Sequence, residues 1–160
     1  MQNTLNVVAR GEREILITRS FDAPRDLVFE AMTRPELLKK WLGVFGGWSL
    51  EVCEIDLREG GTYRYLWRGP DGATMGMRGL YREVVVPERI VNTERFDDPW
   101  YPGEAEGTML LTEQDGRTML TITMLYDSRE TRDAVIKSPM EQGMGAGYNQ
   151  LDEVLAAIAA

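Results

Sequence analysis

The sequence contains no histidine and only one cysteine, and both scarcities exclude kinds of chemistry. Without histidine, the chain cannot build Ser-His-Asp or Cys-His nucleophile systems, His-ligated metal sites or a histidine general base. Cys53 alone cannot form an internal disulfide or a thiolate metal site. Acid–base chemistry would have to use Asp, Glu, Tyr, Lys or Cys53. We expect no metal and no cofactor.

Basic residues and long hydrophobic runs are also scarce. The 18 Lys and Arg residues are outnumbered by 26 Asp and Glu residues, which gives a formal net charge of −8. Nucleic acids and anionic membrane surfaces are bound through clustered Lys and Arg, so neither is an expected partner. No apolar run approaches the roughly 18 residues that span a bilayer, and the first residues lack a signal-peptide pattern. We therefore expect a cytoplasmic protein without membrane insertion.

The length and composition of the chain fit one folded domain. It has 160 residues, of which 43% are hydrophobic and 28% are charged. These values are typical of a single soluble domain. Residues up to about Gly11 show no strong periodicity, which is typical of a chain terminus without fixed structure. We predict a flexible tail over residues 1–12 and one domain over residues 13–160.

The first part of this domain has the pattern of a strand followed by two short helices. Residues 14–21 place Ile15, Ile17, Arg19 and Phe21 on one face, as in a half-buried strand. Asp22 is the expected cap of the first helix, with Pro24 in its first turn. The second helix is expected to begin at a capping box of the form Thr-x-x-Glu, formed by residues 33–36.

Turn residues then divide the chain at hairpin intervals. Asp115-Gly116 is the strongest hairpin signal, and the Gly-containing segments at 58–61 and 69–72 and the Pro87-Glu88 pair mark further turns. With the strand at 14–21, these turns predict about seven sequential, mostly antiparallel strands. The added strands are expected at 48–57, 62–68, 74–86, 89–96 and on either side of Asp115-Gly116.

The last part of the chain returns to helical spacing. Ser128 is expected to open a short helix that runs to Ile136, and residues 138–141 form a second capping box before a long final helix. One face of the final helix carries an apolar stripe of Met140, Met144, Tyr148, Leu151, Leu155 and Ile158. The order of elements predicts an α+β fold in which a curved antiparallel sheet wraps around this helix. Such a sheet is expected to leave an apolar cavity beside the helix.

Six short motifs follow one another over nearly the whole length of the chain. They are Phe21-Asp22-Ala23-Pro24 with Val28-Phe29, Pro35-Glu36 with Trp41, Asp56-Leu57-Arg58 with Gly60-Gly61, Gly79-x-Tyr81-x-Glu83-Val84, Pro87-x-Arg89, and Met140-x-x-Gly143-Met144. In this order they resemble the homologues of the heat-shock-protein-90 ATPase activator, a family of the START and birch-pollen-allergen-like (SRPBCC) superfamily. The resemblance covers residues 13–160.

The resemblance implies a helix-grip fold, an internal cavity and, across the superfamily, binding of lipids, hormones, polyketides and other apolar molecules. The family name also implies co-chaperone work. The chain has no segment equivalent to the additional N-terminal domain of the eukaryotic activators, and we therefore do not expect a chaperone partner. The expected partner is a small apolar molecule, and a homodimer is left open.

Aromatic and methionine side chains are the main candidates for the cavity wall. Tyr63, Tyr65 and Trp67 alternate on one strand face, either as flat walls with polar tips or as ordinary core. Methionines would give a deformable lining, although core packing is equally typical of them. Trp41 fits either the cavity entrance or a structural contact between the short helices and the sheet.

Two carboxylates and one loop complete the set of candidates. Glu83, predicted on the same face as Tyr81, and Glu104 could act as desolvated acids. The loop with Trp100 and Glu104 could close a cavity mouth, or it could be a surface turn packed by its own rings. No residue is assigned as catalytic. The ligand-binding candidates are Trp41, Tyr63, Tyr65, Trp67, Met77, Tyr81, Glu83, Trp100, Glu104, Met144 and Tyr148.

Three functions remain compatible with the sequence. Binding of a small hydrophobic or aromatic molecule in the cavity is the hypothesis that the apolar lining favours. An enzyme of the cyclase, hydratase or lyase type would instead use Glu and Tyr side chains in the same cavity. A co-chaperone-like interaction protein would need an exposed patch able to bury about 1,000 Å² or more.

Overall fold

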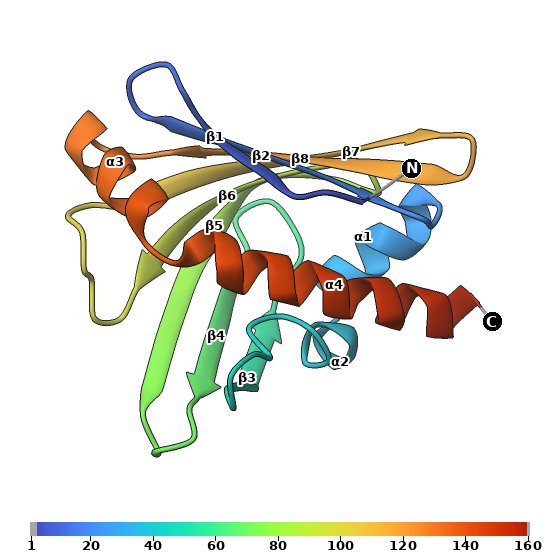
Figure 1. Ribbon diagram of the computed structural model, residues 1–160, viewed down its shortest axis with the longest axis horizontal. Coiled ribbons are helices and arrows are strands. Elements are labelled where there is room, and N and C mark those ends of the chain that lie inside the picture. Colours follow the sequence, from blue (N-terminus) through green and yellow to red (C-terminus); the bar gives the residue numbers. More distant parts are fainter. Residues whose placement is uncertain (1–2, 160) are drawn as a thin grey trace.

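An antiparallel sheet curves around one long helix in the computed structural model, which describes residues 3–159 (Figure 1). Within these residues the sheet has eight strands in the order β1-β2-β8-β7-β6-β5-β4-β3, and every neighbouring pair is antiparallel. The elements are β1 (Asn6–Arg10), β2 (Glu14–Phe21), α1 (Arg25–Thr33), α2 (Pro35–Leu38), β3 (Ser49–Ile55), β4 (Thr62–Arg68), β5 (Thr74–Val85), β6 (Arg89–Phe96), β7 (Ala105–Gln114), β8 (Arg117–Leu125), α3 (Arg129–Lys137) and α4 (Met140–Ala159).

Helix α4 crosses the concave face of the sheet, and α1 and α2 lie near its C-terminal half (Figure 1). The apolar stripe of α4 explains this position, because Tyr148, Leu151 and Leu155 are buried against the sheet, as the helical spacing predicts. Strand β2 contributes the opposing surface, with Ile15, Ile17 and Phe21 fully buried. The predicted α+β class and helix-grip arrangement are confirmed, with one strand more than the seven expected.

The additional strand is β1, which lies inside the segment predicted to be a tail. It pairs with β2 from Asn6 opposite Thr18 to Arg10 opposite Glu14, so the prediction is wrong for residues 6–10. Met1 and Gln2 lie outside the described residues. An edge strand is held mainly by backbone hydrogen bonds, and only Val7 of β1 is partly buried. Its side chains therefore carry no periodic signal.

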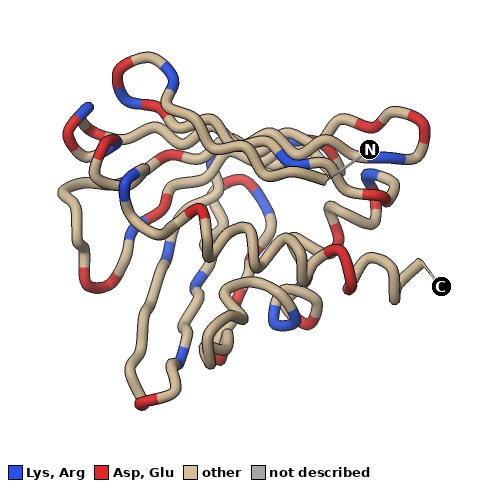
Figure 2. Tube along the Cα trace, viewed as in Figure 1, with Lys and Arg blue, Asp and Glu red and all other residues tan. Residues whose placement is uncertain are grey.

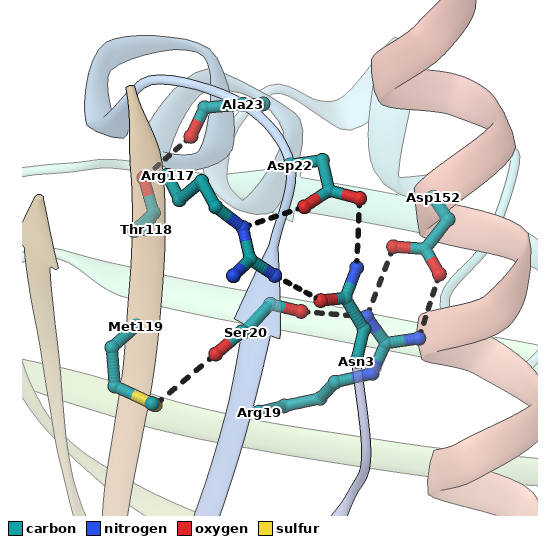
Figure 3. A network of polar contacts seen from close by, with 9 residues as sticks. All are labelled: Asn3, Arg19, Ser20, Asp22, Ala23, Arg117, Thr118, Met119 and Asp152. Atoms are coloured by element: carbon teal, nitrogen blue, oxygen red, sulfur yellow. Dashed lines mark hydrogen bonds and ion pairs between the residues drawn. The ribbon is translucent and has the colours of Figure 1, made fainter. Parts of the chain in front are cut away.

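The start of α1 is capped by a distant carboxylate and not by the expected Asp22. Pro24 occupies the capping position, and the backbone N–H of Arg25 donates to Glu113 of β7 over 2.6 Å. The Asp22 carboxylate instead accepts from Arg117 at 2.7 Å and from Asn3 at 3.2 Å (Figure 3). Asp22 therefore connects the N-terminal segment to the β7–β8 hairpin.

Neither predicted capping box forms. The hydroxyl of Thr33 donates to the Phe29 carbonyl at 2.7 Å, and that of Ser138 donates to the Val135 carbonyl at 2.5 Å. Each hydroxyl thus satisfies the end of the preceding helix instead of the start of the next. The predicted cap at Ser128 is confirmed, since its hydroxyl accepts from the Thr131 N–H at 3.1 Å.

A buried ion pair fixes α4 to the sheet. Arg19 of β2 is only 2% exposed, and its guanidinium contacts the Asp152 carboxylate at 2.7 Å (Figure 3). It also donates to the Asn149 side chain at 3.0 Å. The same group lies 4.7 Å above the ring of Phe21. An arginine in an otherwise apolar strand face is therefore explained by its partners on the helix.

The tight turn between β7 and β8 confirms the strongest hairpin signal. Asp115 and Gly116 have positive φ angles of 55° and 76°. Two consecutive positive φ values suit the right-handed twist of a two-residue hairpin, which favours Asp-Gly. Within residues 3–159, no helix is long and apolar enough to cross a membrane.

Candidate functional site

A cavity of about 190 Å³ lies between the concave face of the sheet and helices α1, α2 and α4. It is lined mainly by aromatic, methionine and aliphatic side chains, with two polar residues from β6. The lining residues are Met32, Thr33, Leu38, Trp41, Leu42, Tyr63, Tyr65, Met77, Tyr81, Ile90, Asn92, Glu94, Met109, Ile122 and Tyr148.

Strand alternation brings a group of tyrosines to one wall of the cavity. Tyr63 and Tyr65 of β4 share the concave face, with ring centroids 5.0 Å apart, and Tyr81 of β5 lies 5.3 Å from Tyr63. Trp67 shares this face but does not line the cavity. Its indole N–H donates to the Leu42 carbonyl at 3.0 Å and so holds the segment after α2.

Glu83 lies outside the cavity because β5 contains a bulge. Tyr81 pairs with Asn92, whereas Glu83 already pairs with Val91, so the register shifts by one residue between them. A bulge of this kind reverses which residues face inward. Val84 consequently packs against the core, and Glu83 forms a surface ion pair with Arg89 at 2.9 Å. The prediction that Glu83 shares a face with Tyr81 is wrong.

The loop between β6 and β7 does not contribute its predicted residues to the cavity. Trp100 is 52% exposed and packs edge-on against Tyr101 at 5.2 Å. Glu104 lies 3.8 Å from Arg95 and lines a hollow on the opposite face of the sheet. The buried aromatic of this loop is Tyr101, which packs against Tyr126 at 5.6 Å. The loop therefore matches the surface turn packed by its own rings.

Two of the remaining candidates meet at the helical wall. Tyr148 of α4 lies 5.9 Å from Trp41, and both line the cavity. The Trp41 indole also donates to the Ala31 carbonyl at 2.9 Å, which connects the segment after α2 to α1. Met77 lines the cavity, whereas Met144 packs between the two core clusters.

Sequence reasoning missed Glu94, the one carboxylate among residues 3–159 that lines the cavity. Burial removes water from this group and raises its pKa from the ordinary value near 4.5 to about 7. Glu94 has no hydrogen-bond or ion-pair partner among residues 3–159. Burial is the main reason that the pKa values of Tyr63, Tyr65, Tyr101 and Tyr126 are raised, and the charge of Glu94 raises them further.

The signal for Glu94 was present but ambiguous. Ile90, Asn92 and Glu94 alternate along β6, while Val91 and Thr93 form the other face. Each face mixes apolar and polar side chains, so alternation alone does not say which one is buried. Only the pairing with β5 and β7 places Glu94 inside.

The amide of Asn92 is partly committed to its neighbours. Its nitrogen donates to the Tyr63 hydroxyl at 3.1 Å and to the Thr93 carbonyl at 3.2 Å. The Tyr63 hydroxyl in turn donates to the same carbonyl at 2.5 Å. The Asn92 amide oxygen accepts no hydrogen bond from residues 3–159. The cavity thus contains two unused acceptor groups, the Glu94 carboxylate and this oxygen.

Comparison with known proteins places this fold in a family. Residues 22–156 match the sequence profile described as Activator of Hsp90 ATPase homolog 1-like protein. The chain belongs to this family. A protein from Rhodobacter sphaeroides with a solved structure is 32% identical, has a TM-score of 0.89, and aligns over 96% of this chain and 98% of its own. A comparison with curated proteins gave no match.

Two further solved structures support the assignment to the Hsp90 ATPase activator homologue family. Protein Ms6760 from Mycobacterium smegmatis is 25% identical, with a TM-score of 0.85 over 97% of this chain and 99% of its own. A protein from Nitrosomonas europaea is also 25% identical, with a TM-score of 0.82 over 94% of this chain and 99% of its own. The predicted resemblance is therefore confirmed over the matched residues.

In this member of the Hsp90 ATPase activator homologue family, some side chains that could react lie outside the cavity and one lies inside it. Cys53 is buried in the core, where burial raises the pKa of its thiol to about 11, so the reactive thiolate is scarce at neutral pH. Asp56 and Arg58 form an exposed ion pair at 2.9 Å. Among residues 3–159, Glu94 alone combines a cavity position with a pKa near neutrality.

Proposed function

We propose that this protein binds a small, mostly apolar molecule in the cavity between the sheet and α4. The cavity itself, lined by aromatic and methionine side chains, is the observation that carries the proposal. Protein interiors are otherwise close-packed, so a space of about 190 Å³ lined by apolar side chains is a place where a ligand can bury apolar surface.

The volume limits the size of the ligand. Pockets for drug-sized molecules measure about 300–1,000 Å³, and this one has about 190 Å³. It therefore suits one aromatic ring or a short apolar chain better than a phospholipid or a sterol. Met77 and Met109 can change rotamer at low cost, so the wall can adapt to the shape of its ligand.

A cavity-filling variant tests this function. Met109→Trp should occupy the cavity, whereas Met119→Trp adds the same ring on the outer face, where Met119 is 41% exposed. We expect native mass spectrometry of the wild type and of Met119→Trp, purified from the natural host, to retain a small molecule. Met109→Trp should retain none while keeping a native circular dichroism spectrum.

A thermal-shift screen of aromatic and short-chain metabolites completes the test. A ligand at about 100 times its dissociation constant stabilises the folded state by about 2.7 kcal/mol, which raises the melting temperature by several degrees. The shift should be lost in Met109→Trp and kept in Met119→Trp. If no mass is retained and no compound shifts the transition, the proposed function is wrong.

Acid–base catalysis in the same cavity is a second candidate function, and Glu94 is the observation that favours it. A carboxyl with a pKa of about 7 can both accept and donate a proton at neutral pH. Glu83 and Glu104, the carboxylates considered from sequence, lie outside the cavity. A carrier would release the captured molecule unchanged, whereas an enzyme would convert it and would lose turnover in Glu94→Gln. Mass analysis of the released molecule after incubation separates the two.

A further inference from the structure

We propose that the ligand carries a positive charge: a small aromatic or apolar amine whose ammonium group contacts Glu94 among the tyrosine rings of the cavity. This inference rests on the proposed binding function and specifies its ligand class. Three features of the cavity carry it: its hydrogen-bonding groups, its charge and its aromatic walls.

Several hydrogen-bond donors of the cavity are committed to the protein. The Trp41 indole, the Thr33 hydroxyl and the Tyr63 hydroxyl all donate to backbone carbonyls. The Asn92 amide nitrogen donates to Tyr63 and to the backbone. The other donors that line the cavity are neutral tyrosine hydroxyls. Within residues 3–159, the Glu94 carboxylate and the Asn92 amide oxygen are strong acceptors without a hydrogen bond. A ligand ammonium group would give them donors together with a positive charge, which the hydroxyls cannot supply.

The charge of the cavity has one sign. Among its lining residues Glu94 is the only acid, and no lysine or arginine lines it. Arg95, which follows Glu94 in β6, contacts Glu104 on the outer face, and Arg19 of β2 contacts Asp152 of α4. The other titratable groups that face the cavity are the hydroxyls of Tyr63, Tyr65, Tyr81 and Tyr148. Their pKa values are raised by burial, so they remain neutral and cannot balance Glu94.

A ligand cation would supply the missing charge. A carboxylate in a partly buried site favours an opposite charge, because water screens the interaction less there than at the surface. An anionic ligand would be repelled by the Glu94 carboxylate, and a neutral ligand would leave its negative charge without a counter-charge. The raised pKa of Glu94 is consistent with this absence of a counter-charge.

The aromatic walls suit a cation as well as an apolar body. Tyr63, Tyr65 and Tyr81 form one cluster, and Trp41 with Tyr148 forms another across the cavity. The faces of these rings attract cations that lose their water, and Trp and Tyr do so best. The same rings pack against the apolar part of the ligand. Aromatic cages with a carboxylate are therefore chemically matched to organic amines.

Three probes of similar size and different charge test the inference. Benzylamine is cationic, benzyl alcohol neutral and benzoate anionic, and each can be titrated by calorimetry at pH 8, where Glu94 is ionised. We expect benzylamine to bind at least tenfold more tightly than benzyl alcohol, and benzoate to bind more weakly than both. Glu94→Gln should abolish the preference for the amine. Glu104→Gln, which removes a carboxylate from the outer face, should leave it unchanged.

The pH dependence provides a second readout in the unmodified protein. The amine stays protonated between pH 5.5 and pH 8, so only Glu94 changes charge at the site. Its pKa of about 7 implies that benzylamine affinity falls roughly thirtyfold from pH 8 to pH 5.5, with little change for benzyl alcohol.

The outcomes of these experiments distinguish the cationic ligand class from the proposed binding function on which it rests. Equal binding of benzylamine and benzyl alcohol to the wild type, tighter binding of benzoate, or an unchanged preference in Glu94→Gln would each overturn the cationic ligand class. If benzylamine fails to bind while a neutral compound from the thermal-shift screen binds, the cationic ligand class is wrong and the proposed binding function still holds. Failure of every probe and every screened compound would remove both.

Discussion

Glu94 makes the stability of the folded protein depend on pH. Its pKa is about 7 in the folded state and near 4.5 when it is solvated, so the folded state holds a proton that the unfolded chain has released between these values. Stability therefore falls as pH rises from about 4.5 to 7 and stays reduced above 7. Each pKa unit corresponds to about 1.4 kcal/mol, so a carboxyl moved from pKa 4.5 to about 7 would lose roughly 3.5 kcal/mol, and the partial exposure of the Glu94 side chain reduces this to roughly 2–3 kcal/mol.

Glu94→Gln should remove this penalty. We expect the variant to be about 2–3 kcal/mol more stable than the wild type at pH 8 and nearly equal to it at pH 4.5. Urea unfolding of both proteins at the two pH values measures the difference, and the comparison cancels the other titrating groups. Glu104→Gln serves as the exposed control and should show no such pH-dependent gain. Equal stability of Glu94→Gln and the wild type at pH 8 would mean that the Glu94 carboxyl is well solvated.

The contrast between Glu83 and Glu94 explains how far sequence reasoning reaches for single residues. Alternation placed Tyr63 and Tyr65 on the concave face because β4 is regular up to Trp67. The same counting failed one strand later, where a bulge adds a residue between Tyr81 and Glu83. A bulge depends on the pairing of two strands, so the sequence of one strand does not reveal it.

One buried ion pair joins α4 to β2, beside the Arg19–Asn149 hydrogen bond and the ring contact between Phe21 and Tyr148. Arg19 is buried, and Asp152→Asn would leave its charge without a carboxylate partner. Breaking a buried pair from one side costs about 3–5 kcal/mol, and the partial exposure of Asp152 favours the lower end. We expect a loss of about 3 kcal/mol in the free energy of unfolding, measured by denaturant titration.

The neighbouring Glu153 provides the matched control for this prediction. It is exposed and has no ion-pair partner among residues 3–159, so Glu153→Gln should change stability by less than about 0.5 kcal/mol. If Asp152→Asn were equally mild, the pair would not hold the helix. A double variant provides a further check. When Arg19→Met, which removes the charge and keeps an apolar chain, is combined with Asp152→Asn, it should restore part of the stability that Asp152→Asn alone loses.

At the scale of elements, the predictable features were those encoded locally. The Asp115-Gly116 turn needs two positive φ angles, and few other residue pairs supply them. The helix caps were less predictable, because a hydroxyl between two helices can bond to either one. Thr33 and Ser138 both bond backward. Strand β1 was invisible because backbone pairing, and not side-chain burial, holds it in place.

The shape of the whole molecule follows from one amphipathic helix and a sheet long enough to curve around it. The apolar stripe of α4 predicted this arrangement, but the volume left beside the helix depends on the fit of many side chains. Charged residues lie mostly on the surface, where Lys and Arg are interspersed with Asp and Glu along the loops and strands (Figure 2). The surface therefore offers mixed charge, whereas the cavity carries only that of Glu94.

Because the cavity lies between α4 and the sheet, a ligand should stiffen both layers together. Its walls come from α1, α2, the strands from β4 to β8 and the segment of α4 around Tyr148, whereas no described residue of α3 or β1 lines it. We expect hydrogen exchange to slow in those walls when the cavity is filled and to stay unchanged in α3 and β1. Mass spectrometry of peptides from the protein with and without benzylamine measures this. Slower exchange confined to α3, β1 or the β7–β8 turn at Asp115-Gly116 would show that the amine binds elsewhere.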